Sequence, residues 1–390
     1  MPLSNEDNLR LNVLMSQDVK AIRIDEGKML LYALTAKGEA KVQFNANEKN
    51  ERYLKLVKDF LSTKVLGVAG GFPVYLSHWN RMGEAKSNDL GKLLLLGEDE
   101  ATIAVVNSDD LTAEVAEYAW WSYQGADNAR SMLSHPKIIE SDIAKELAQF
   151  LLEFLPFEED PEKMLISIRL VLQPGLINED EKQALWKKAK SKNTLYIGFL
   201  DSIPNDLPEV YSAHHSFQEI KSELSIVEDK NAFAAKLLLL LSPQGQSFLA
   251  TAKSAFKRIP NQVVYIALID SIRRYIAYPI HEHATSLFDQ NISINANREL
   301  ETDIDKFMSA CQQYCVSGAN ETQLQQDFQE VTNINPDLYD ILISMITLAN
   351  MTHALSYPVF SQSTCVGSLM RKKLKFLSDA IILNINKLMV

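Results

Sequence analysis

The sequence predicts a mainly α protein of the α+β type: a small N-terminal antiparallel sheet with helices, then HEAT-like helical hairpins and a C-terminal helical bundle. Short apolar segments around two glycine turns precede Asn45, and apolar residues recur at helical spacing from about Asn88 onward. Capped breaks between helices recur along the middle of the chain. We therefore expect a small α+β domain at residues 1–87, degenerate helical-hairpin repeats at 88–210, and an all-helical domain at 211–390.

The N-terminal part has the pattern of a β-meander covered by helices. Gly27 and Gly38 stand in the two turns, where we expect each to take the positive φ that a chain reversal needs. A helix with Tyr53, Val57 and Phe60 on one face is expected to cover the sheet. The expected elements are a helix at 5–16, strands at 20–25, 29–35 and 39–44, and a helix at 47–61.

A helical hairpin is predicted most clearly between Met164 and Ala189. Pro174 ends its first helix, because proline lacks an N–H and pushes Gln173 out of the α region. Asn178 then accepts from the free amides of the second helix, whose first turn is acidic, as the positive end of a helix favours. This hairpin is an architectural feature and carries no catalytic motif.

Two counterparts of Asn178 indicate that the hairpin is repeated. Thr112 and Ser141 each precede a helix with acidic residues in its first turn and follow an apolar helix ended by a short break. The intervals, roughly 30 to 40 residues, are typical of stacked helical hairpins that bury their apolar faces against their neighbours. An irregular helical bundle with coincidental phasing is the alternative.

The C-terminal part reads as helical throughout, apart from one long loop. Leu237–Leu241 is too uniformly apolar for a surface helix, so we expect it at the centre of this domain. Residues 278–299 lack periodicity and indicate a loop. The expected helices are 213–226, 230–241, 244–257, 261–277, 299–316, 321–331, 336–355 and 364–388.

Composition narrows the classes of partner and compartment. The formal net charge is −11, which repels nucleic acid and anionic membranes. We expect no DNA partner, and the basic cluster Arg371–Lys375 is read as a solvated helix face, so RNA is not favoured. No apolar stretch passes the test for a membrane span, no secretory signal is expected, and three cysteines cannot form a disulfide framework. A cytoplasmic location is the simplest expectation.

Few residues suggest chemistry. His281 and His283 alternate in the expected loop and could supply two metal ligands, and Cys311 and Cys315 lie four residues apart on one predicted helix face. The cysteines could complete a metal site or act as reactive thiols, but small buried side chains and a solvated loop are the simpler readings. We therefore predict no cofactor, no catalytic residues and no metal site, with these four residues as the candidates if one exists.

Three other features have structural readings. We expect His214 and the adjacent His215 to be surface or helix-cap residues, and His353 to be a core histidine on an apolar helix. The glycine-rich stretch 65–83 lacks the ending of a P-loop and is read as a buried connection. No nucleophile elbow, zinc-protease motif or paired-carboxylate motif appears, so an enzyme is unsupported.

Several short segments, in order, resemble DsrS-type proteins, which are accessory proteins of the Dsr gene cluster in bacteria that oxidise stored sulfur through a reverse-acting dissimilatory sulfite reductase. The resemblance is clearest over about residues 8–208. The segments are Asn8–Leu14, Ala21–Asp25, Gly70–Tyr75 with Trp79–Gly83, Val171–Ile177 and Tyr196–Leu200. The resemblance implies a cytoplasmic, cofactor-free protein that supports or regulates sulfur oxidation, and it brings no catalytic residues.

The expected function follows from the repeats and the resemblance together. We expect a non-enzymatic accessory or regulatory protein of dissimilatory sulfur oxidation that acts through contacts with a protein partner. The alternative is a sulfur-handling enzyme or carrier in which Cys311 or Cys315 accepts a persulfide.

Overall fold

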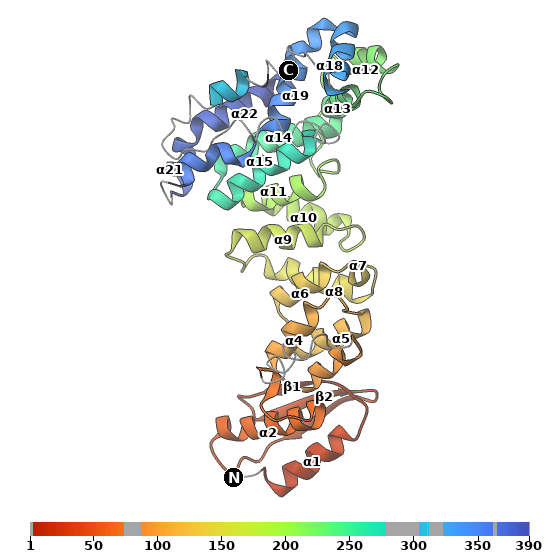
Figure 1. The fold of residues 1–390 in the computed structure, drawn as a ribbon, viewed down its shortest axis with the longest axis vertical. Helices are drawn as coiled ribbons and strands as arrows, with labels where there is room; N and C mark the ends of the chain where they lie inside the picture. The colour runs from red at the N-terminus through yellow and green to blue at the C-terminus, as the bar shows by residue number, and fades with distance from the viewer. Residues whose placement is uncertain are drawn as a thin grey trace. The chain divides into compact units, whose positions relative to one another are not determined.

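The computed structural model describes residues 3–73, 87–277, 304–309, 311, 323–361 and 365–389. It confirms the predicted fold class, since many helices follow a three-stranded antiparallel sheet near the N-terminus (Figure 1). The chain forms two compact units, Met1–Phe157 and Glu158–Val390. The boundary falls inside the segment 88–210, so the units do not coincide with the three expected domains, and that finer division stays a prediction.

The sheet is the predicted meander, with strand order β1-β2-β3. Its strands are β1 (Val19–Asp25), β2 (Leu30–Thr35) and β3 (Gly38–Gln43). Gly38 has φ 111°, as expected, but in the first turn the positive φ belongs to Met29, at 53°, and not to Gly27. The Asp25 carboxylate holds that turn by accepting from the Lys28 amide at 3.0 Å, and the Met29 carbonyl accepts from the Phe44 amide at 3.0 Å.

Helices cover the sheet of the first unit. Side chains of α1 (Asn5–Met15) and α2 (Asn50–Leu66) share one buried cluster with Leu31 and Val42 of the strands. Strand β1 also contacts the helices at Ser87–Leu95 (η1) and Ala113–Ser122 (α5). The other helices of this unit are η1 (Ser87–Leu95), α4 (Asp99–Val106), α5 (Ala113–Ser122), α6 (Ala126–Leu133), α7 (Pro136–Ile139) and α8 (Ile143–Phe154).

Two of the three predicted helix caps are present. Thr112 accepts from the Val115 amide at the start of α5, and Asn178 forms a capping box with Glu181 at the start of α10 (Glu179–Ala189). Ser141 does not cap α8. The residue directly before that helix is Asp142, and the Ser141 hydroxyl donates to the Ile138 carbonyl at 2.6 Å. Only two of the three caps that suggested a repeated hairpin are therefore present.

All the regular elements in the described residues of the second unit are helices. Two of its predicted helices are interrupted, 336–355 at Met351 and 364–388 at Leu374. The remaining helices are α9 (Pro161–Val171), α11 (Asn193–Ser202), α12 (Phe217–Leu224), α13 (Ala232–Leu241), α14 (Pro243–Ala255), η2 (Phe256–Arg258), α15 (Gln262–Ala277), α18 (Gln323–Ile334), η3 (Pro336–Leu338), α19 (Tyr339–Asn350), η4 (His353–Ser356), α20 (Tyr357–Phe360), α21 (Gly367–Lys373) and α22 (Lys375–Lys387).

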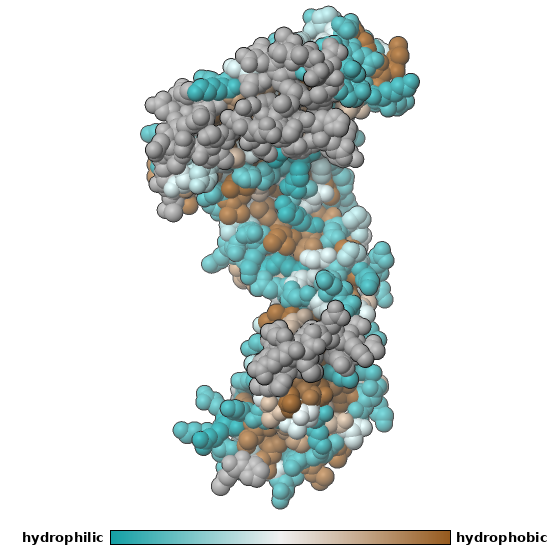
Figure 2. Space-filling model, viewed as in Figure 1, coloured by the Kyte–Doolittle hydropathy of each residue, from teal (hydrophilic) through white to brown (hydrophobic). Residues whose placement is uncertain are grey.

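Close helix packing builds the core of the second unit. Gly198 of α11 lies against Ile168 of α9, where an added Cβ would come within 2.5 Å of the isoleucine side chain. Phe233 and Phe248 are fully buried on α13 and α14, which confirms that the apolar run near Leu237 is central. On the face shown in Figure 2, hydrophilic residues are interspersed with hydrophobic ones, as is normal for helices that bury one side.

Helices α13 and α14 meet at a single residue, Ser242. Its amide donates to the Leu238 and Leu239 carbonyls at the end of α13, and its hydroxyl accepts from the Gly245 amide at the start of α14. The turn is so tight that a Cβ on Gly245 would lie 2.3 Å from the Leu239 carbonyl oxygen and 2.4 Å from the Leu240 Cα.

No single helix among the described residues is long and apolar enough to cross a membrane. Pro336–Asn350 and His353–Phe360 reach that length only when joined across a 73° bend.

Replacing Asn178 with alanine is expected to lower the free energy of unfolding by about 1 kcal/mol. The substitution removes the acceptor for the Glu181 amide, which lies 2.9 Å from Asn178 Oδ1, and keeps the reciprocal bond, in which the backbone amide of residue 178 donates to Glu181 Oε2. Chemical denaturation measures the change. Asp180→Ala in the same exposed first turn is the control, and an equal loss in both variants would contradict the capping account.

Candidate functional site

The residues that the sequence singled out are only partly described. His281, His283 and Cys315 lie outside the described residues, and Cys311 is completely buried. Burial withdraws the Cys311 sulfur from solvent, whereas a persulfide acceptor must meet its donor. In the described ranges, no group of three or more histidine, cysteine or acidic residues is placed to hold a metal ion. The metal and persulfide hypotheses thus stay predictions, without a described site.

His214 and His353 lie in environments that differ from those expected: His214 is buried and His353 is exposed. His353 is exposed, and its Nδ1 lies 3.1 Å from Asp270 Oδ1, so it is not the core histidine that its apolar surroundings in the sequence predicted. His214 is buried instead, with 7% of its surface exposed, so it is not a surface residue. Its contact with the amide of Ser216, the residue that precedes α12, agrees with the other expectation, that of a helix-cap residue. Long-range packing contributes to the burial of His214, since its amide donates to the Leu241 carbonyl at the end of α13.

The basic cluster near the C-terminus is partly engaged within the protein. Arg371 donates to the Ile259 carbonyl at 2.8 Å, and Lys375 is paired with Asp379 at 2.7 Å. These contacts fit the expectation of a helix face and give no support to a nucleic-acid surface.

A pocket with a volume of about 530 Å³ lies in the second unit. Its walls come from the residues before α12, from η3 and α19, and from the end of α22. We call it the His214 pocket. It is defined by His214, His215, Ser216, Glu219, Ile220, Asn335, Asp337, Leu338, Asp340, Ile341, Leu383, Asn386 and Lys387.

Hydrogen bonds within the protein hold the walls of the His214 pocket in place. Asn335 donates from Nδ2 to Glu223 Oε2 at 2.7 Å, which joins the start of η3 to α12. The same side chain accepts from the Asp337 amide at 3.0 Å. The pocket is therefore held by contacts between segments far apart in the sequence, which favours a preformed site.

His214, which lines the pocket, carries a buried N–H donor. Its Nδ1 accepts from the Ser216 amide at 3.2 Å, so in the neutral ring the proton lies on Nε2. Burial lowers the pKa of His214 below its usual value of 6.5, and neighbouring His215, whose ring centroid is 4.3 Å away, adds to the effect. The ring is thus neutral near pH 7, and its Nε2 is buried without a hydrogen-bond partner in the described part of the chain.

Asn386, which also lines the pocket, carries a buried acceptor. Its Oδ1 is buried and, within the described ranges, has no hydrogen-bond donor. A buried polar atom without a partner costs about 1–3 kcal/mol, so such atoms are uncommon unless a ligand or water satisfies them. An unpaired donor and an unpaired acceptor thus lie on two residues that line the same pocket, which makes this pocket the candidate site.

The remaining lining gives the pocket a negative charge and an apolar contact. Glu219, Asp337 and Asp340 carry three carboxylates, against the single ammonium of Lys387. Leu383 is half exposed at the pocket, which places an apolar side chain within reach of a ligand. The pocket therefore suits a ligand with a positive charge, hydrogen-bonding groups of both kinds and some apolar surface.

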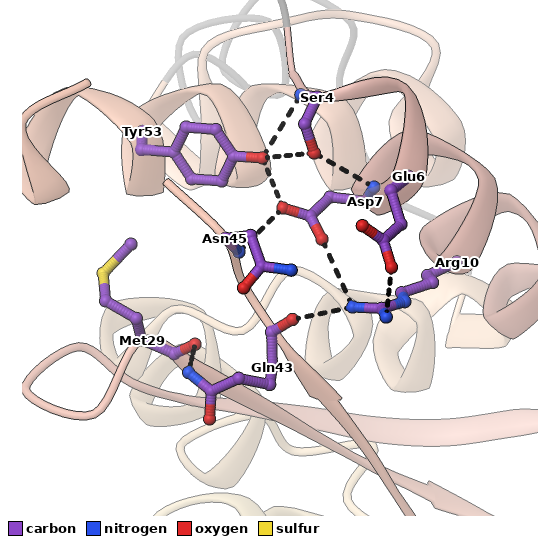
Figure 3. Close-up of polar contacts among 8 residues, drawn as sticks. All are labelled: Ser4, Glu6, Asp7, Arg10, Met29, Gln43, Asn45 and Tyr53. Atoms are coloured by element: carbon purple, nitrogen blue, oxygen red, sulfur yellow. Dashed lines mark hydrogen bonds and ion pairs between the residues drawn. The ribbon is translucent and has the colours of Figure 1, made fainter. Parts of the chain in front are cut away.

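The first unit holds a second polar cluster, which is structural (Figure 3). Asp7 is fully buried, and its Oδ2 accepts from the Tyr53 hydroxyl at 2.5 Å and from the Asn45 amide at 3.1 Å. Burial, followed by the hydrogen bond to Asp7, raises the pKa of Tyr53. Because these groups bind one another across α1, α2 and the end of β3, the cluster fastens the helices to the sheet.

No family model, curated protein or solved structure matches this chain. The fold therefore defines the class, a mainly α protein with an N-terminal meander, and the resemblance to DsrS-type proteins stays a prediction that rests on the quoted segments.

Sequence reasoning missed the His214 pocket for a definable reason. Its defining atoms come from positions near 214, 337 and 386, which only tertiary packing brings together. One signal was available in the sequence. His214 and His215 stand side by side before a helix, and no apolar pattern explains why two histidines lie there. Asn386 gave no signal, because a polar residue near the end of an amphipathic helix is usually exposed.

Proposed function

We propose that this chain is a non-enzymatic accessory or regulatory protein that acts by binding a protein partner, and that the His214 pocket receives a short basic segment of that partner. The observation that carries the proposal is the pair of unpaired buried atoms, His214 Nε2 and Asn386 Oδ1, on residues lining one pocket. A peptide unit supplies both missing groups, since its C=O accepts from the imidazole N–H and its N–H donates to the amide oxygen.

The charge and size of the pocket support the same ligand class. Glu219, Asp337 and Asp340 favour a lysine or arginine side chain, and the exposed part of Leu383 favours an apolar neighbour in the same segment. A volume of about 530 Å³ lies in the range of ordinary ligand pockets and accommodates only a few residues of a partner.

The geometry of Ser216 supports binding over catalysis. A serine nucleophile needs its hydroxyl on a base, but the contact between Ser216 and His214 uses the serine backbone amide. The imidazole nitrogen that would act as base is already occupied by that amide. The pocket thus has a donor and an acceptor for recognition, without the paired groups of acyl transfer.

The setting that we propose is dissimilatory sulfur oxidation in the cytoplasm. Its support is the ordered set of segments that resembles DsrS-type proteins, including Val171–Ile177 at the α9–α10 hairpin. In that setting the partner belongs to the sulfur-oxidation system, and the accessory protein supports or regulates it without performing the chemistry.

The test combines purification with complementation. The tagged wild-type chain is expected to co-purify with a protein of the sulfur-oxidation system under native conditions and to restore sulfur oxidation in a deletion strain. The double variant Asp337→Lys/Asp340→Lys is expected to lose the partner, because it reverses the charge of the pocket. Binding of the identified partner is then measured by isothermal titration, with at least a tenfold weaker affinity expected for the variant.

Asp379→Lys is the matched control, because Asp379 is an exposed acid on α22 that does not line the pocket. It should bind the partner like the wild type. Loss of binding in both variants would indicate a general charge effect, and unchanged binding in the double variant would exclude the pocket as the binding site. Normal sulfur oxidation in the deletion strain would contradict the proposed setting.

A further inference from the structure

A lone lysine interrupts the most apolar helix of the second unit. Lys236 lies in the middle of α13, within the sequence AFAAKLLLLL, and only 8% of its surface is exposed. Its Nζ donates to the Tyr275 carbonyl at 2.8 Å and lies 5.5 Å from the centroid of the Tyr275 ring. No carboxylate of the described residues forms an ion pair with it.

The interactions of Lys236 leave its ammonium under-satisfied. A lysine ammonium carries three N–H donors, and a single carbonyl occupies one of them. Burial lowers the pKa of Lys236 to about 8, which still leaves most of the side chain protonated near pH 7. A buried charge without a counter-ion is costly, so its retention inside an apolar helix calls for a compensating negative group.

Lys236 lines a cavity of about 220 Å³ together with residues of α11, α15 and the segment after α11. The negative group of this cavity is already neutralised, because the Asp201 carboxylate is paired with both Arg169 and Arg274. The lining of the cavity thus carries the lysine and the guanidinium group of Arg274 against one carboxylate, so the balance of its formal charges is positive.

The neighbours of Lys236 are held in place by their own contacts. The Tyr275 ring stacks on Phe248 with centroids 3.9 Å apart, and its hydroxyl donates to Asn205 Oδ1 at 2.7 Å. Ser271 donates to Asp201 Oδ1 at 3.3 Å. Since Asn205 uses its oxygen for Tyr275, its Nδ2 remains a donor at the rim of the cavity.

We propose that this cavity binds a compact oxyanion, with the Lys236 ammonium as its principal counter-charge and Arg274 and Asn205 as additional donors. The anion is a carboxylate or a small inorganic oxyanion, because the cavity is smaller than the usual range for larger organic ligands. A cation is disfavoured by the positive balance, and a neutral ligand would leave the buried ammonium without compensation. The site is separate from the His214 pocket and does not depend on the proposed partner.

The test is isothermal titration and thermal denaturation of the full chain with sulfate, phosphate and acetate at constant ionic strength, with chloride as the reference salt. The wild type is expected to bind at least one oxyanion with a stoichiometry of one and to show a rise in its melting temperature. Comparison of the three salts distinguishes a tetrahedral oxyanion from a carboxylate. A wild-type response no greater than that to chloride overturns the proposal.

Lys236→Met tests the assignment of the counter-charge. Without added oxyanion this variant should melt at a higher temperature than the wild type, because it removes a desolvated charge, and it should bind the oxyanion at least tenfold more weakly. Lys145→Met, at an exposed position of the first unit, is the matched control and should bind like the wild type. Full retention of binding by Lys236→Met overturns the proposal.

Asn205→Asp provides a second variant at an exposed position, so it should leave folding intact. It places a carboxylate at the rim of the cavity and is expected to weaken oxyanion binding at least fivefold, while Asn205→Gln keeps the donor and should bind like the wild type. Equal affinities for the aspartate and glutamine variants would place the anion elsewhere on the protein.

Discussion

Replacing Asp7 with alanine is expected to lower the free energy of unfolding of the Met1–Phe157 unit by about 3 kcal/mol. The carboxylate accepts from the Tyr53 hydroxyl and the Asn45 amide, and Tyr53 is completely buried (Figure 3). The substitution therefore leaves the Asn45 amide without its acceptor and leaves the Tyr53 hydroxyl only the 3.2 Å bond to Ser4 Oγ. Tyr53→Phe should cost less, because it removes one donor and leaves the Asn45 amide bound to Asp7.

Chemical denaturation, followed by tryptophan fluorescence and circular dichroism, measures both changes. Glu6→Ala is the control on the same helix, since Glu6 is exposed and its pairing with Arg10 is a surface contact of small value. A loss for Asp7→Ala no larger than for Glu6→Ala would show that the cluster in Figure 3 does not fasten α1 to the rest of the unit.

Gly245→Ala is expected to destabilise the second unit by on the order of 3 kcal/mol. The new methyl group would meet the backbone of Leu239 and Leu240 at distances of 2.3–2.4 Å. Backbone atoms at the end of a helix cannot move aside as a flexible side chain can, so α13 and α14 would have to separate. The Gln246 side chain, which donates to the Leu240 and Leu388 carbonyls, would lose its fixed geometry as well.

The melting temperature and the denaturation midpoint of Gly245→Ala test this expectation. Gly91→Ala is a suitable control, because the nearest atom to an added Cβ there is Val115 Cγ2 at an ordinary 3.7 Å. The control should be neutral or slightly stabilising, since alanine reduces the freedom of the unfolded chain. Equal stability of the Gly245 variant and the wild type would contradict the packing of the α13–α14 turn.

Local signals predicted the local structure well. The meander, the hairpin around Pro174 and the caps at Thr112 and Asn178 depend on neighbours within a few residues, so the sequence contains most of the information. Two errors were local and concerned positions one or two residues apart. Asp142 replaces Ser141 before α8, and Met29 takes the left-handed conformation that Gly27 was expected to take.

Long-range packing decided what the sequence could not predict. The interruptions at Met351 and Leu374 are not marked by proline or glycine at those positions, so periodicity carried the predicted helices through them. The candidate site was missed for the same reason, since His214 and Asn386 lie on one pocket only in the folded chain. Lys236, by contrast, was visible as a single charge in an apolar run and could have been singled out.

Because Ser242 ends one helix and begins the next, α13 and α14 cannot fray independently at their junction. Unwinding the last turn of α13 frees the Ser242 amide, and the same movement takes the serine hydroxyl away from the Gly245 amide. Local opening there becomes a single cooperative event that spans both helices, in place of two separate ones. Lys236 lies on the first of these helices and Phe248 on the second. Contacts that hold Lys236 in place therefore also slow the opening of the core around Phe248.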